Sequence, residues 1–233
     1  MYRRSVLGQF WITLSMAITF LAIGSVFGLI FDAPVLEYLP FLGCGLVFFA
    51  FLSSILNDGS QAFIAAQPFI NQLALPPVTF FLRSVWKSFF VFLHNCVALV
   101  VLLFIFPPGI SFATLLVIPG LVLAGAGMAG LGLALAMLAT RFRDIPQIIA
   151  AAVQVFFYLT PIVWLPSAIP EKARDLIVTW NPFYHFLQVT RQPLLNEYPT
   201  AQEWLVACAL AIGLIGLGAA SYAWKRRQLA FWV

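Results

Sequence analysis

Long stretches without any Asp, Glu, Lys or Arg alternate along this chain with short polar or proline-containing breaks. The uncharged stretches cover residues 5–31, 38–57, 88–140, 145–170 and 204–224. A helix needs about 20 apolar residues to cross the hydrocarbon core of a bilayer. With breaks at 32–34, 107–109 and 166, the pattern predicts membrane helices near residues 9–31, 36–56, 84–106, 113–139, 146–165 and 204–224.

The fold class that follows is all-α: a polytopic membrane protein with about six transmembrane helices in a single domain, residues 1–233. A membrane β-barrel would need alternating segments of about ten residues, and the sequence contains none. The first apolar run reaches Phe31 without a small-residue cleavage site, so we interpret it as a permanent helix and not as a removable signal peptide.

The basic residues indicate an orientation. With six spans both termini lie on one side, and nine of the twelve basic residues share that side: Arg3, Arg4, Arg83, Lys87, Arg141, Arg143, Lys225, Arg226 and Arg227. Only three, Lys172, Arg174 and Arg191, lie opposite. Because Lys and Arg concentrate in cytoplasmic loops, we expect both termini in the cytoplasm.

Composition narrows the class further. Hydrophobic residues make up 63% of the chain and charged residues 9%, against about a quarter charged in soluble domains, which excludes a water-soluble fold. The net charge of +4 falls at membrane-flanking positions, so topology accounts for it and no nucleic-acid partner is expected. Cys44, Cys96 and Cys208 lie far apart inside apolar stretches, which indicates packing residues and neither a disulfide framework nor a metal site.

An outer segment, residues 166–203, is too polar to span the membrane yet rich in apolar side chains. Asn181-Pro182 can start a short helix there, since proline suits the first helical position. We predict one or two amphipathic or re-entrant helices that plug the outer mouth before the last span. The alternative is a loop lying on the membrane surface.

Two glycine patterns need an interpretation. The run from Gly125 to Gly130 matches GxGxxG, but a dinucleotide site needs a preceding strand and a later acidic residue, and this run lies inside a predicted membrane helix. Close packing of helices explains it better, as it does the GxxxG pair Gly24 and Gly28. No GxxxxGK[ST] occurs, so any ATPase that energises the protein must be a separate chain.

Polar side chains inside the predicted spans are the candidates for lining a passage. His94 and Asn95 fall near the middle of the third span and Gln154 in the fifth, where polar groups normally face a bundle interior or an aqueous cavity. Interhelical hydrogen bonding is the simpler alternative. Aromatic faces can stack on sugar rings, and the candidates beside Gln154 are Phe156, Phe157 and Tyr158. No catalytic arrangement and no metal ligands are evident.

The stretch from Asn57 to Pro77 is cytoplasmic by this topology and nearly uncharged. Its apolar run, 62–75, is broken by Pro68 and needs something to cover it. One interpretation continues the second and third helices into the headgroup region. The other is a short helix that docks in a partner's groove, by which a subunit without an ATP site could receive mechanical work.

Several segments together resemble the membrane subunit of ABC-2 type polysaccharide exporters, the group that handles O-antigen, capsule and teichoic acid. They are Tyr2 to Gly8 with Trp11, Phe69 to Gln72 with Leu75-Pro76, His94-Asn95, Arg141 to Pro146, Tyr158 to Ile162, and Asn181-Pro182 followed by Arg191. They occur in the expected order and cover nearly the whole chain.

The resemblance implies a homodimer of six-helix subunits in the bacterial inner membrane, bound to two ATP-binding subunits that hold ATP and Mg²⁺, with no cofactor on this chain. A lipid-linked polysaccharide would pass through the dimer interface. Arg3 and Arg4 could meet the diphosphate of the lipid carrier, or act only as topology signals. The coupling segment would be Phe69, Ile70, Asn71 and Gln72, and the inner-end gate would be Arg141, Arg143 and Asp144.

One departure and three rivals remain. Members of the group usually carry an amphipathic segment before the Tyr2-Arg3-Arg4 motif, whereas this sequence begins at Met1, so either the start is truncated or gating differs. An ABC-2 exporter of a drug or lipid would share the architecture. A membrane enzyme acting on polyprenyl-linked glycans would need a carboxylate or His and Arg cluster that the sequence does not show, and a passive channel would need no ATPase.

Overall fold

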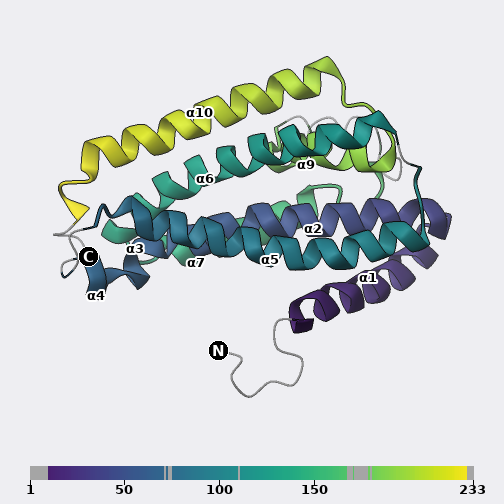
Figure 1. Ribbon diagram of the computed structural model, residues 1–233, viewed down its shortest axis with the longest axis horizontal. Coiled ribbons are helices and arrows are strands. Elements are labelled where there is room, and N and C mark those ends of the chain that lie inside the picture. The colour runs from purple at the N-terminus through teal and green to yellow at the C-terminus, as the bar shows by residue number, and fades with distance from the viewer. Residues whose placement is uncertain are drawn as a thin grey trace.

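The computed structural model describes residues 10–70, 72, 75–109, 111–166, 170, 178 and 180–229, and every regular element among them is a helix (Figure 1). The long helices are α1 (Phe10–Ile30), α2 (Val35–Ser60), α5 (Val78–Ile105), α6 (Val117–Arg141) and α10 (Ala201–Lys225). The shorter elements are α3 (Ala62–Ala65), α4 (Gln67–Ile70), η1 (Phe112–Leu116), α7 (Ile145–Leu159), α9 (Pro182–Arg191) and η3 (Gln192–Leu195). This confirms the all-α prediction.

Five helices are long and apolar enough to cross a membrane, counting η1 and α6 as one. The sixth predicted span, 146–165, is wrong in its extent. Helix α7 has 15 residues and is about 22 Å long, short of the roughly 30 Å hydrocarbon core. It ends because Pro161 disfavours helical geometry at Thr160, whose ψ of 135° is extended. The described residues therefore contain five helices long enough to span a bilayer and one shorter apolar helix, α7.

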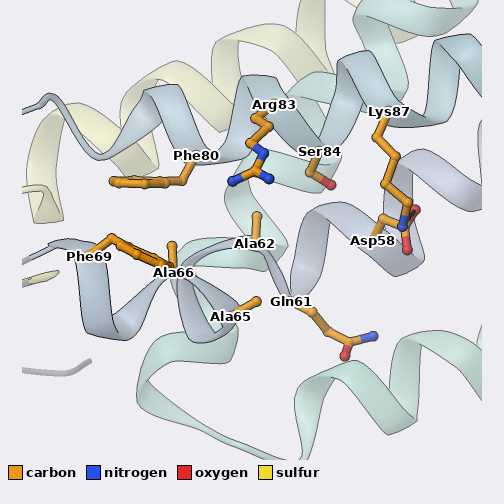
Figure 2. A pocket seen from close by; sticks show the side chains of 10 residues that line it. All are labelled: Asp58, Gln61, Ala62, Ala65, Ala66, Phe69, Phe80, Arg83, Ser84 and Lys87. Carbon is orange, nitrogen blue, oxygen red and sulfur yellow. Dashed lines mark ion pairs between the residues drawn. The ribbon is translucent and has the colours of Figure 1, made fainter. Parts of the chain in front are cut away.

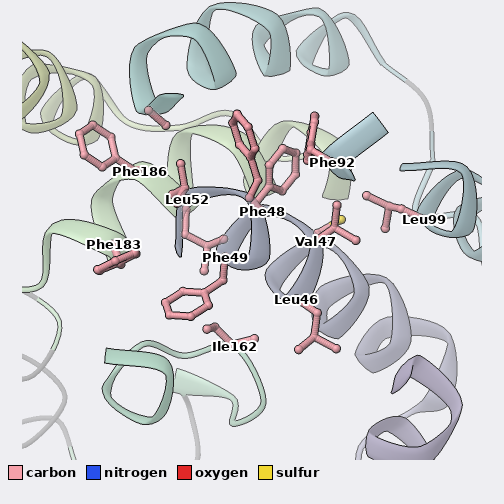
Figure 3. Packing of buried hydrophobic residues seen from close by; sticks show 14 of the residues in the cluster. Leu46, Val47, Phe48, Phe49, Leu52, Phe92, Leu99, Ile162, Phe183 and Phe186 are labelled. Atoms are coloured by element: carbon pink, nitrogen blue, oxygen red, sulfur yellow. The ribbon is translucent and has the colours of Figure 1, made fainter. Parts of the chain in front are cut away.

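Helix α2 is the hub of the bundle. It contacts α1, α5, α6, α7 and α9, and most of its length is buried, whereas most of α1 and α10 is exposed. The aromatic side chains of α2 explain this position: Phe48 packs on Phe92 of α5, with ring centroids 5.7 Å apart, and Phe49 packs on Phe183 of α9 at 5.0 Å (Figure 3). Such ring pairs add about 0.5–1.5 kcal/mol to the burial of their area.

Glycines bring α6 and α10 together. A Cβ at Gly130 would meet the backbone of Leu214 and Ile215, and one at Gly218 would meet the backbone of Gly130. Only glycine therefore allows this approach, and α6 with α10 is the most extensive helix pair in the described chain. The interpretation of the Gly125–Gly130 run as a packing feature is confirmed, and Gly24 likewise packs against Leu39 of α2.

Helices α3 and α4 lie at one end of the bundle, away from the turn that joins α1 to α2 (Figure 1). They are held by a small separate core in which Phe63 contacts the group that includes Phe81, Met137 and Leu229. The first interpretation of residues 57–77, a continuation of the flanking helices, is confirmed in part, and docking of a short helix on a partner stays a prediction. Helices α2 and α5 extend four and six residues beyond the predicted 56 and 84, and two short helices fill the gap between them.

Candidate functional site

The outer segment before the last span contains a buried helix. Asn181 begins α9: its Oδ1 accepts hydrogen bonds from the backbone N–H groups of Phe183 and Tyr184 at 3.0 and 3.3 Å, and Pro182 occupies the first helical position. Most of α9 is buried against α2, α6 and α10. The prediction of a short inserted helix is confirmed, and the surface-loop alternative is wrong for residues 182–191.

Side chains replace the backbone hydrogen bonds that are lost where α7 stops. Arg191 Nη1 donates to the carbonyl of Pro161 at 2.7 Å, and Tyr38 donates from its hydroxyl to the carbonyl of Val163 at 2.7 Å. Asn181 Nδ2 donates to Thr160 Oγ1 at 2.8 Å. Non-helical backbone at membrane depth is tolerated only where protein surrounds and satisfies it. These contacts therefore explain how the chain can leave the helix at Pro161.

Arg191 is a cation held by neutral groups. Its side chain is 2% exposed, its Nη2 donates to Gln188 Oε1 at 2.7 Å, and its guanidinium lies 4.0 Å from the centre of the Phe41 ring. No carboxylate of the described residues forms an ion pair with it. Burial lowers the pKa of Arg191, in α9 and outside the spanning helices, to about 10, so it stays charged at neutral pH. We call Tyr38, Thr160, Asn181, Gln188 and Arg191 the outer cluster, after the side that the predicted orientation gives it.

Helix α7 exposes a stripe of three polar residues and one alanine. Gln147, Ala151, Gln154 and Tyr158 repeat at intervals of four, three and four residues, so they share one face, and all four are exposed. Tyr158 is 66% exposed. An amide such as Gln154 is costly in contact with lipid tails. We expect this α7 stripe to face water or another protein chain.

The other lining candidates lie elsewhere. His94 is half-buried on α5, where its Nδ1 is 2.8 Å from the carbonyl of Phe90, and its own carbonyl accepts from Thr13 of α1. Asn95 is buried. Phe156 packs on Phe183 and Phe157 on Phe49, with centroids 5.3 and 5.5 Å apart. Of the three aromatic candidates, only Tyr158 stands on the exposed face with Gln154.

The predicted coupling segment divides into buried and exposed positions. Ile70 is buried in the small core under α3 and α4, so it anchors the segment. Phe69 is 49% exposed and Gln72 is exposed, so these two can reach a partner. Asn71 lies outside the described residues, and so do Arg3 and Arg4.

The predicted inner-end gate occupies the tight turn between α6 and α7. Arg141, Arg143 and Asp144 are all exposed. The Arg141 guanidinium lies 5.4 Å from the centre of the Phe142 ring, and the Asp144 carbonyl accepts from the N–H groups of Gln147 and Ile148 at the start of α7. The turn therefore fixes where the α7 stripe begins.

A pocket of about 630 Å³ opens between the start of α5 and the helices α3 and α4 (Figure 2). Lys87 and Asp58 form an ion pair of 3.0 Å at one side of it, and Arg83 points into it from α5. We call this the inner pocket, after the cytoplasmic side that the predicted orientation gives it. Sequence reasoning used Arg83 and Lys87 only as topology signals and missed it, because the pocket depends on how α3 folds back beneath α5.

The described residues contain no group of three His, Cys, Asp or Glu side chains that could hold a metal ion. They form a helical bundle in which α7 exposes polar side chains. The short helices α3 and α4 are partly exposed at the end of the bundle where Arg83, Lys87 and Arg141 also lie. The class that this fold defines is a multi-pass helical membrane protein.

Residues 1–195 match the sequence profile of the ABC-2 type transporters, and the chain belongs to that family. Two curated relatives from Klebsiella pneumoniae, each called O-antigen export system permease protein RfbA, are 25% and 24% identical over 201 and 196 residues. Each match covers 84% of this chain and 75% of the relative. The chain is thus a multi-pass inner-membrane transport component, and the family implies an ATP-binding partner.

Proposed function

We propose that this chain is the permease subunit of an exporter that moves a lipid-linked polysaccharide of the O-antigen kind outward across the inner membrane. A separate ATP-binding subunit supplies the energy, and two copies of this chain enclose the passage. The observation that carries the proposal is the exposed α7 stripe of a chain whose relatives are O-antigen export permeases.

The chemistry of the α7 stripe supports a glycan as cargo. Gln154 offers an amide donor and acceptor to sugar hydroxyls, and Tyr158 offers a ring face together with a hydroxyl. Neither side chain carries a charge that would immobilise a moving polymer. Because α7 is too short to span the bilayer, a second copy facing it would enclose this polar surface and shield it from lipid.

The exposed part of the coupling segment supports a separate motor. Phe69 and Gln72 stand out from a segment that Ile70 and Phe63 attach to the ends of α5 and α6. A movement of the ATP-binding subunit against such an anchored segment would be transmitted to α5 and α6, whereas a loosely attached loop would deform without moving these helices.

Deletion of the gene is the decisive experiment, with surface glycan and cytoplasmic lipid-linked polymer both measured. We expect surface polymer to disappear while full-length lipid-linked chains accumulate inside. Loss of polymer from both places would indicate a role in synthesis. An unchanged glycan would mean that the cargo is another molecule, such as a drug or a lipid.

Complementation with variants of the α7 stripe then tests the passage. Gln154→Leu should leave the protein in the membrane and reduce export at least about tenfold, since the stripe loses its central polar group. Val155→Leu, an exposed neighbour outside the stripe, is the matched control and should export normally. Equal export by both variants would contradict a lining role for the stripe.

A further inference from the structure

The inner pocket has the chemistry of an anion site. Arg83 and Lys87 bring two positive charges to it and Asp58 brings one negative charge, so it keeps a net charge of +1. Asp58 engages Lys87, whereas no described residue pairs with the Arg83 guanidinium. Arg83 is exposed and points between α5 and α3 (Figure 2).

A second observation concerns Ser84, whose side chain also lines the inner pocket (Figure 2). Its Oγ is buried and has no hydrogen-bond partner among the described residues. A buried hydroxyl without a partner costs free energy, so such groups generally mark the place of a ligand or a bound water. Arg83, Ser84 and Lys87 all line this pocket from α5, so the hydroxyl and the two cations together can offer several donors to the oxygens of one phosphate group.

The surroundings distinguish a lipid phosphate from a free one. An exposed apolar stripe runs along α5 from the inner pocket toward the other end of the helix: Leu82, Trp86, Phe90, Leu93, Val97, Val100 and Phe104. Its spacing of four and three residues keeps it on one face. Trp86, 60% exposed and next to Lys87 in sequence, is typical of the level where headgroups meet acyl chains. Acyl chains that follow the stripe would bring their phosphate to Arg83.

We propose that the inner pocket binds the phosphate of an anionic membrane lipid. Arg83 and Ser84 hold the phosphate oxygens, Lys87 adds a second positive charge, and the α5 stripe receives the acyl chains. Basic pockets between membrane helices bind anionic lipids by this combination of charge and apolar surface. Since Phe69 of the coupling segment lines the opposite wall together with α3, a bound lipid would tie that segment to α5. The proposal is independent of what the protein exports.

Native mass spectrometry of the full chain, released from detergent and titrated with phosphatidylglycerol, tests the proposal. Arg83→Gln should weaken binding of the first lipid about tenfold, since it removes a charge-assisted hydrogen bond. Ser84→Ala should weaken it about threefold. The matched control is Arg227→Gln, which removes one charge from another exposed arginine and should change the affinity less than about twofold.

Three results would overturn the proposal. Equal losses in Arg83→Gln and Arg227→Gln would reveal unspecific attraction to a basic surface. Displacement of the lipid by millimolar inorganic phosphate would indicate a site for a free anion. Loss of lipid binding in the complex with the ATP-binding subunit would show that the partner covers the pocket. Trp86→Ala separates the contributions further, because it should weaken phosphatidylglycerol binding and leave inorganic phosphate unaffected.

Discussion

Two arginines show how differently the two ends of the bundle use positive charge. Arg191, in the outer cluster, is 2% exposed and has a carbonyl, an amide oxygen and a ring face around it. Arg83, in the inner pocket, is exposed and unpaired among the described residues. The outer cation donates two hydrogen bonds to its own chain, whereas the inner one donates none to the described residues.

A charged side chain in a membrane protein is therefore structural where the fold supplies its hydrogen-bond acceptors. It is available for binding where the fold supplies none. The outer cluster has to be closed because it satisfies backbone groups exposed by the break at Pro161. At the inner end, water and headgroups can satisfy a cation, so the fold can leave Arg83 open. Substitutions at the two ends should therefore act differently on stability and function.

The largest effect should follow from Arg191→Met. It removes two hydrogen bonds made by a buried charge and leaves the carbonyl of Pro161 without its donor, so the free energy of unfolding should fall by about 3 kcal/mol. Export should be lost with the fold of the outer cluster. Unfolding in mixed micelles measures the stability. Arg226→Met, at an exposed position, should stay within about 0.5 kcal/mol.

If the Arg191→Met protein has normal stability but no longer exports, the structural role of Arg191 is refuted. Arg191 would then act on the substrate and not on the backbone at Pro161. Arg191→Lys discriminates as well: it keeps the charge but cannot reach both acceptors in the same planar geometry, so we expect intermediate stability.

At the inner end, Arg143→Ala should abolish export and change the free energy of unfolding by less than about 0.5 kcal/mol, because Arg143 is exposed in the turn before α7. The measurement is surface glycan beside the amount of inserted protein. Arg143→Lys, which keeps the charge, should retain partial export. Normal export by the alanine variant would refute the inner-end gate.

Asn181→Ala should lower the free energy of unfolding by about 1.5 kcal/mol, since it removes the cap of α9 and the bond to Thr160. Asn181→Asp keeps the capping oxygen and loses only the donor to Thr160, so it should cost less. A double-mutant cycle with Thr160→Val isolates the side-chain pair. Coupling near zero between the two positions would mean that the pair does not hold α9 to the end of α7.

The sequence was sufficient to predict the five long helices but not the early end of α7. Uncharged runs located the ends of α1, α2, α5, α6 and α10 to within six residues, because length and apolarity decide whether a helix crosses a membrane. Residues 161–165 are uncharged as well. Pro161 is the sequence signal for the end of α7, and the contacts to Tyr38 and Arg191 show how the backbone beyond it is held. Periodicity cannot reveal bonds between segments so far apart in sequence.

For the candidate site, the sequence indicated which side chains are unusual but not where they point. Gln154 and Tyr158 share the exposed face of α7, while Phe156 and Phe157, equally plausible by position, pack inward. Arg191 resembled one more outer charge, and its burial depends on α9 folding back against α2 and α6. The inner pocket likewise exists only once α3 and α5 are adjacent.

A small effect on stability should come from Asp58→Asn, which also tests how the inner pocket uses its charges. The ion pair with Lys87 is partly exposed, 66% at the lysine and 37% at the aspartate side chain, so its loss should cost less than about 1 kcal/mol. The same change removes the one negative charge of the inner pocket, so phosphatidylglycerol should bind about threefold more tightly. Unfolding and lipid titration of one protein sample measure both. Weaker lipid binding would mean that Asp58 positions Lys87 for the phosphate, and the inner pocket would then be as preorganised as the outer cluster.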